Sequence, residues 1–133
     1  MTPGTERRLL QIAVGVACLV PLTAGTYGML RGVAAIDASA ATSGAFDAHF
    51  RYLSGLLCGI GIAFAVSIPR IETHGQRFKL LTAIVFLGGL ARLGAYVTGV
   101  STSMDTILPL GMELVVTPLL ALWQVRVARS LSA

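Results

Sequence analysis

Four long apolar stretches dominate this chain, and they constrain its fold more than any other feature. A helix needs about 20 predominantly apolar residues to cross a bilayer, and each stretch is close to that length. Only 12% of the 133 residues are charged, against about 25% in soluble domains, which excludes a soluble globular fold. The sequence therefore predicts an all-α protein of one domain, residues 1–133, folded as a four-helix up-and-down transmembrane bundle. The predicted spans cover residues 9–30, 50–68, 78–100 and 106–127.

Basic residues flank these spans unevenly, and their asymmetry predicts the orientation of the chain. Cytoplasmic connections of membrane proteins carry an excess of Lys and Arg. Seven of the ten basic residues lie before the first span, between the second and third, or after the fourth: Arg7, Arg8, Arg70, Arg77, Lys79, Arg126 and Arg129. We therefore expect both termini in the cytoplasm. The basic residues do not alternate with exposed aromatic residues, so nucleic-acid binding is excluded.

The third and fourth spans each contain one charge, at matching depth and of opposite sign. Arg92 lies eight residues before the end of the third span, and Glu113 lies seven residues after the start of the fourth. The short connection 101–105 makes these spans antiparallel, so both charges lie roughly 10–12 Å from the same membrane face. A charge at such depth is costly and usually faces a partner or a wet cavity. Spacing leaves two interpretations open: a salt bridge that fixes helix register, or part of a ligand or catalytic site.

Other polar residues fall in the outward halves of the predicted spans. Because a bundle brings these halves together, we expect an outward-facing polar pocket. Its candidate residues are Tyr27, Asp47, His49, Arg51, Arg92, Tyr96 and Glu113. Asp47 and Arg51 are four residues apart, which is also the spacing of a local ion pair on one helix surface. Asp47 is further placed to cap the second span by accepting free amides of its first turn.

Small residues and prolines add local predictions. Gly55 and Gly59 have the GxxxG spacing that allows close helix approach, either within the bundle or in a dimer. Pro21 and Pro118 lie inside spans, where each is expected to kink its helix or free a carbonyl. Cys18 and Cys58 lie in apolar stretches and are expected to be free thiols. No metal-ligand spacing, phosphate loop or nucleophile motif appears, so we expect no metal and no cofactor.

Several ordered strings resemble a known family. They are Asp47-x-His49-Phe50-Arg51-Tyr52-Leu53-Ser54-Gly55, Ile68-Pro69-Arg70-Ile71-Glu72 and Phe86-Leu87-Gly88-Gly89-Leu90-Ala91-Arg92, followed by Glu113 and Pro118. Over about residues 46–129, and more loosely in the first span, the chain resembles a group of small bacterial membrane proteins described as domain of unknown function 4345. The resemblance implies a four-span protein of the bacterial inner membrane with no established activity. It supports His49, Arg51, Arg92 and Glu113 as site residues without naming a ligand.

Three functions fit these observations. The preferred one is a binding or accessory protein, in which a membrane lipid or other hydrophobic small molecule places its polar head near Arg92 and Arg51. Such charges suit an anionic or hydroxylated head group. The second is an intramembrane lipid-modifying enzyme of the isomerase or hydratase type, which uses Glu113 or His49 as acid and base. The third is a structural subunit of a homo-oligomer or a larger membrane complex.

Overall fold

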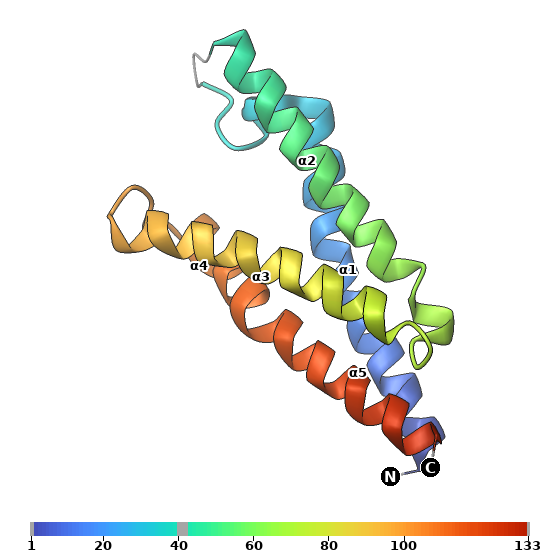
Figure 1. Ribbon diagram of the computed structural model, residues 1–133. Coiled ribbons are helices and arrows are strands. Elements are labelled where there is room, and N and C mark those ends of the chain that lie inside the picture. Colours follow the sequence, from blue (N-terminus) through green and yellow to red (C-terminus); the bar gives the residue numbers. More distant parts are fainter. Residues whose placement is uncertain (1, 40–42, 133) are drawn as a thin grey trace. The chain divides into compact units, whose positions relative to one another are not determined.

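The computed structural model describes residues 2–39 and 43–132, and every regular element in them is helical (Figure 1). The first half contains α1 (Pro3–Arg31), the short 3-10 helix η1 (Gly32–Ala35) and α2 (Gly44–Ala65). The second half contains η2 (Ile68–Arg70), α3 (Gly75–Val97), α4 (Met104–Gly111), the π-helical turn η3 (Met112–Val116) and α5 (Thr117–Ser132). The described residues form no strand, so the predicted all-α class with four long apolar helices is confirmed.

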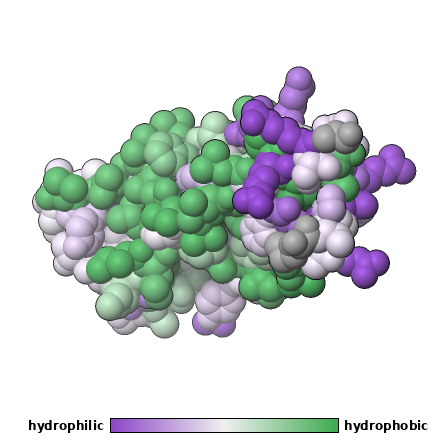
Figure 2. Space-filling view, turned by 90° about the horizontal axis from the view of Figure 1, so that it is seen from below, coloured by the Kyte–Doolittle hydropathy of each residue, from purple (hydrophilic) through white to green (hydrophobic). Residues whose placement is uncertain are grey.

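Four helical stretches are long and apolar enough to cross a membrane. They are Pro3–Ala35, Gly44–Arg70, Gly75–Val97 and Met104–Ser132. Many large apolar side chains on them are exposed, including Leu30, Leu87 and Val97. Figure 2 shows the same pattern on one face, where apolar residues form a broad surface and hydrophilic residues gather on one side. Such exposure is stable against lipid tails, which are as apolar as leucine, and the protein is a multi-pass membrane protein.

The helices pack into two compact units. The α1–α2 unit comprises residues 12–68, and the α3–α5 unit comprises residues 2–11 and 69–132. The first two turns of α1 thus belong to the α3–α5 unit. The prediction of one domain over residues 1–133 stays a prediction.

In the α1–α2 unit, the two helices approach to backbone contact through glycines of α1. A Cβ added at Gly25 would lie 2.6 Å from the backbone nitrogen of Cys58 and 2.8 Å from the carbonyl oxygen of Ser54. A Cβ at Gly28 would collide with the Ser54 hydroxyl. Within this unit the close approach therefore does not use the predicted GxxxG pair. A Cβ at Gly55 would make an ordinary 3.7 Å contact, and one at Gly59 would meet nothing within 4 Å.

In the α3–α5 unit, a glycine ends α3 and reverses the chain. Gly99 has a left-handed φ of +75°, which favours glycine because other residues carry a Cβ. Its N–H donates to the Tyr96 carbonyl at 3.1 Å, and the Val100 N–H donates to the Ala95 carbonyl at 3.0 Å. These two bonds form a Schellman motif. The helix consequently ends at Val97, before the predicted boundary at residue 100, and the chain turns within a few residues into α4.

Candidate functional site

The two charges at matching depth do meet. Arg92 on α3 donates from Nε to Glu113 Oε2 at 3.0 Å and from Nη2 to Oε1 at 3.1 Å. This two-bond arrangement is the strongest geometry available to an arginine and a carboxylate. The Glu113 side chain is 17% exposed, whereas that of Arg92 is 39% exposed. The carboxylate of the pair is thus largely covered by the protein, whereas the guanidinium remains accessible.

Gly89 brings the two charged segments close together. It is buried one turn before Arg92, where a Cβ would lie 2.9 Å from the Glu113 Cβ and 2.7 Å from Leu114 Cδ2. Any larger residue would push η3 away from α3. The hydrogen bonds between Arg92 and Glu113 therefore depend on a residue without a side chain at position 89.

Glu113 lies in the π-helical turn η3, and Pro118 explains why that turn forms. A proline has no N–H for the carbonyl four residues earlier, and its ring presses against that carbonyl. Just before it, the backbone N–H of Thr117 bonds to the Met112 carbonyl, and the Thr117 hydroxyl donates to the same oxygen at 2.8 Å. The helix accommodates Pro118 by this widening. Wide turns of this kind are frequent at functional sites.

A second ion pair joins Asp47 and Arg51 on α2, with Nε and Oδ2 2.7 Å apart. The prediction that Asp47 caps α2 is wrong. Ser43 is the N-cap, and its side chain accepts from the Phe46 amide at 3.3 Å. Asp47 lies within the first turn, where it faces the connection from α1. There its Oδ1 accepts from the Val33 amide at 2.8 Å.

Arg51 closes the end of α1. Its Nη1 donates to the carbonyl oxygens of Met29 and Leu30, at 2.7 and 2.9 Å. The last carbonyls of a helix have no partner within it, and a cation there also complements the helix dipole. Gly32 provides the space, because its φ is +60° and a Cβ there would collide with the Asp47 carboxylate. The Asp47–Arg51 pair thus stabilises the α1–α2 connection, and a ligand role for it stays a prediction.

The other predicted site residues lie on exposed helix surfaces. The His49 ring centroid is 6.4 Å from that of Tyr52, with the rings tilted by 33°. Tyr27 belongs to the α1–α2 unit and Tyr96 to the α3–α5 unit, and both are exposed. The pocket expected to join all seven residues stays a prediction. No group of three His, Cys, Asp or Glu side chains in the described ranges could hold a metal ion. Both cysteines are free thiols, as predicted.

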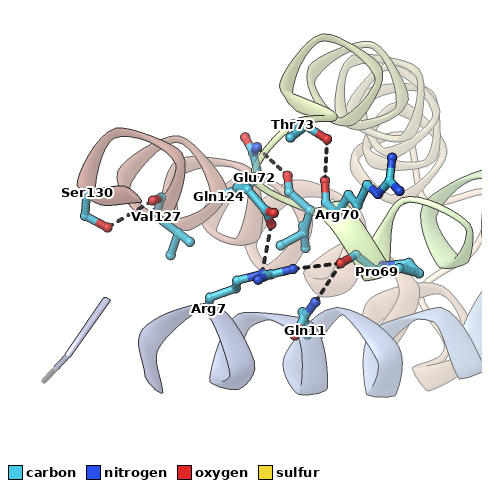
Figure 3. Close-up of polar contacts among 10 residues, drawn as sticks. Arg7, Gln11, Pro69, Arg70, Glu72, Thr73, Gln124, Val127 and Ser130 are labelled. Atoms are coloured by element: carbon cyan, nitrogen blue, oxygen red, sulfur yellow. Dashed lines mark hydrogen bonds and ion pairs between the residues drawn. The ribbon is translucent and has the colours of Figure 1, made fainter. Parts of the chain in front are cut away.

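The sequence reasoning missed a polar network at the end of the α3–α5 unit that contains η2 (Figure 3). Arg7 donates from Nη2 to the Pro69 carbonyl at 2.9 Å, and Gln11 donates to the same oxygen at 3.4 Å. Arg7 Nε also lies 2.9 Å from Glu72 Oε2, which makes an ion pair without hydrogen-bond alignment. The sequence did contain a sign of this network, because Glu6 and Glu72 are single acidic residues within the basic segments that flank the spans.

Two further contacts complete this network. Glu6 is 8% exposed, and its Oε1 lies 2.9 Å from Arg126 Nε. Gln124 is fully buried and donates to the Ile71 carbonyl at 2.8 Å, which fixes α5 to the segment after η2 (Figure 3). Beside them, Glu6, Leu122, Trp123 and Arg126 line an open cleft of about 450 Å³.

Comparison with known families identifies the family of this chain. Residues 9–124 match the family described as domain of unknown function DUF4345. The chain belongs to this family. The predicted resemblance is therefore confirmed, and it extends through the first span. No curated protein and no solved structure matches the chain.

The Arg92–Glu113 pair is the best candidate site in this DUF4345 protein. The Asp47–Arg51 and Arg7–Glu72 pairs each also hydrogen bond to backbone groups, which explains them as structural contacts. Arg92 and Glu113 bond only to each other within the described part of the chain. Arg92 Nη1 consequently has no partner among those residues, although it belongs to a half-exposed side chain inside an apolar helix.

Proposed function

We propose that this protein binds an amphiphile, with the polar head at the Arg92–Glu113 pair and the apolar tail along α3 and η3. The single observation that carries the proposal is the pair itself. It lies within helices long and apolar enough to cross a membrane, and it is open on the guanidinium side. Arg92 Nη1 also remains a donor without a partner among the described residues. A polar group at this depth that is not consumed by backbone contacts favours a ligand role.

The geometry also favours one kind of head group. The opposite charges of Arg92 and Glu113 cancel each other across the two hydrogen bonds. The pair therefore presents a donor and an acceptor side by side without net charge. A hydroxyl can accept from the guanidinium and donate to the carboxylate at the same time. A bare anion would instead have to compete with Glu113 for Arg92. A neutral hydroxylated head group is therefore the better fit.

The other functions remain open as predictions. Both Glu113 oxygens accept hydrogen bonds from Arg92, so the carboxylate lies in the site as half of an ion pair and not as a lone acid or base. The isomerase or hydratase and the structural subunit therefore have less support than binding. The proposal includes an orientation in the bacterial inner membrane with both termini in the cytoplasm, supported by the seven basic residues that flank the spans on that side.

Native mass spectrometry in mild detergent tests the binding function. The variant Arg92→Gln/Glu113→Gln removes both charges together, so it leaves neither one unpaired. Dioleoylglycerol serves as the hydroxylated probe and dioleoylphosphatidic acid as the anionic probe. We expect the wild type to retain dioleoylglycerol preferentially, and the double variant to lose it while keeping its helical circular dichroism.

The matched control is Arg7→Gln/Glu72→Gln, which removes another Arg–Glu ion pair of the same unit. It should retain dioleoylglycerol as the wild type does. Equal retention by both double variants would refute the assigned site. Loss of the folded state in the Arg92→Gln/Glu113→Gln variant alone, with no retained lipid in the wild type, would make the pair a structural contact.

A further inference from the structure

The cleft beside the polar network combines an apolar wall with a charged rim. Leu122 and Trp123 on α5 form the apolar wall, and Glu6 and Arg126 form the rim. All four residues belong to the α3–α5 unit. Trp123 is the chain's single tryptophan, and tryptophan is enriched where the hydrocarbon core meets the head groups. The cleft therefore has the two surfaces that a phospholipid presents, an acyl chain and a polar head.

The rim of this cleft carries excess positive charge. Glu6 is buried, and its Oε1 forms an ion pair with Arg126 Nε at 2.9 Å. The Arg126 side chain is nevertheless 76% exposed. Its remaining guanidinium nitrogens are thus accessible. Arg129 lies three residues further along α5, on the same helix face, and it is exposed and makes no ion pair with any described residue. Four other basic residues of this unit are also exposed and form no ion pair with the described residues: Arg8, Arg70, Arg77 and Lys79.

We propose that this cleft binds an anionic phospholipid of the cytoplasmic leaflet. One acyl chain lies against Leu122 and Trp123, and the phosphodiester accepts hydrogen bonds from Arg126 and Arg129. The planar guanidinium fork matches phosphate oxygens, and basic residues next to a membrane span attract anionic lipids. A zwitterionic phospholipid carries the same phosphate, but its ammonium group is repelled by Arg126 and Arg129. The cleft therefore selects phosphatidylglycerol over phosphatidylcholine, and this inference does not depend on the amphiphile proposed for Arg92 and Glu113.

The single tryptophan provides a direct test. The protein is placed in phosphatidylcholine nanodiscs that contain increasing fractions of phosphatidylglycerol or phosphatidylcholine with brominated acyl chains, which quench nearby tryptophan. We expect brominated phosphatidylglycerol to quench Trp123 at a lower mole fraction than brominated phosphatidylcholine. The difference should shrink as salt is raised, because salt screens charges that face water. Equal quenching by the two lipids would mean ordinary contact with the surrounding bilayer and would overturn the proposal.

Two charge-neutral variants separate the cleft from the general basic surface. Arg129→Gln should reduce the preference for phosphatidylglycerol about fivefold, since one basic side chain next to an anionic lipid contributes a factor of about that size. Arg77→Gln removes the same charge from α3 and should leave the preference nearly unchanged. Neither residue forms an ion pair with the described residues, so both variants should fold. Equal losses in the two variants would refute the assigned site. Competition by inorganic phosphate, but not by chloride at equal ionic strength, would show that the cleft takes a soluble anion instead.

Discussion

Replacing Gly25 by alanine tests whether the α1–α2 unit depends on backbone contact between its helices. The new Cβ would lie 2.6 Å from the Cys58 nitrogen, whereas ordinary contact begins at 3.4 Å, so the helices must separate by about 0.8 Å. Overpacking of this kind costs about 1–3 kcal/mol, and the upper part of that range applies because the nearest atoms are backbone. Alanine regains about 1 kcal/mol of helix propensity. We therefore expect Gly25→Ala to lower the free energy of unfolding by about 1–2 kcal/mol.

Gly59→Ala is the matched control in the same unit. A Cβ there meets no atom of the described residues within 4 Å, so only the helix propensity changes. This variant should gain about 0.5–1 kcal/mol. The same substitution is thus expected to have opposite signs at the two positions, and the variants should differ by about 1.5–3 kcal/mol.

The free energy of unfolding can be measured by titrating the protein in mixed micelles with dodecyl sulfate and following its helical circular dichroism. Both variants and the wild type should lose helix in one transition, with Gly25→Ala at the lowest denaturant fraction. If Gly25→Ala unfolds together with Gly59→Ala, the helices are not held at backbone contact. If Gly59→Ala is instead the destabilised variant, the GxxxG face is buried against another molecule.

Three further predictions follow from the polar contacts. Glu113→Gln should cost about 2 kcal/mol in the same titration, between the values for exposed and buried ion pairs, and adding Arg92→Gln should restore most of it; a larger loss in the double variant would contradict this. Arg51→Gln should speed hydrogen exchange of amides around the α1–α2 connection, while unchanged exchange would mean that the capping bonds are dispensable. The pKa of Asp37 lies below its ordinary value, mainly because the Ser39 hydroxyl donates a hydrogen bond to the carboxylate and, to a lesser extent, because the Ser39 amide does. The stabilisation from these bonds is complete above the unfolded pKa and is lost as pH falls through the folded one. In an NMR titration, the Ser39 amide should therefore respond at a lower pH than ordinary aspartates require, and a midpoint at the ordinary value would contradict the bond.

The candidate site could be predicted in part. The matching depths of Arg92 and Glu113 follow from residue counts along two antiparallel spans, but whether the two charges touch did not, and the structure shows that they do. The two-bond geometry could not be predicted, because it depends on the contact between Gly89 and η3 and on the wide turn before Pro118. The i,i+4 pairing of Asp47 and Arg51 was likewise readable from the sequence.

The number of spans, their approximate ends and the positions of costly charges follow from the amino-acid sequence alone. These properties depend on composition and on neighbours a few residues away, whereas the end of α3 at Val97 depends on the hydrogen bonds around Gly99. The folded chain was needed to show which glycines bring α1 and α2 together, and that Arg51 bonds to carbonyls more than 20 residues earlier in the chain. Contacts of this kind depend on how two helix faces meet, and the spacing of residues along either helix does not specify that meeting.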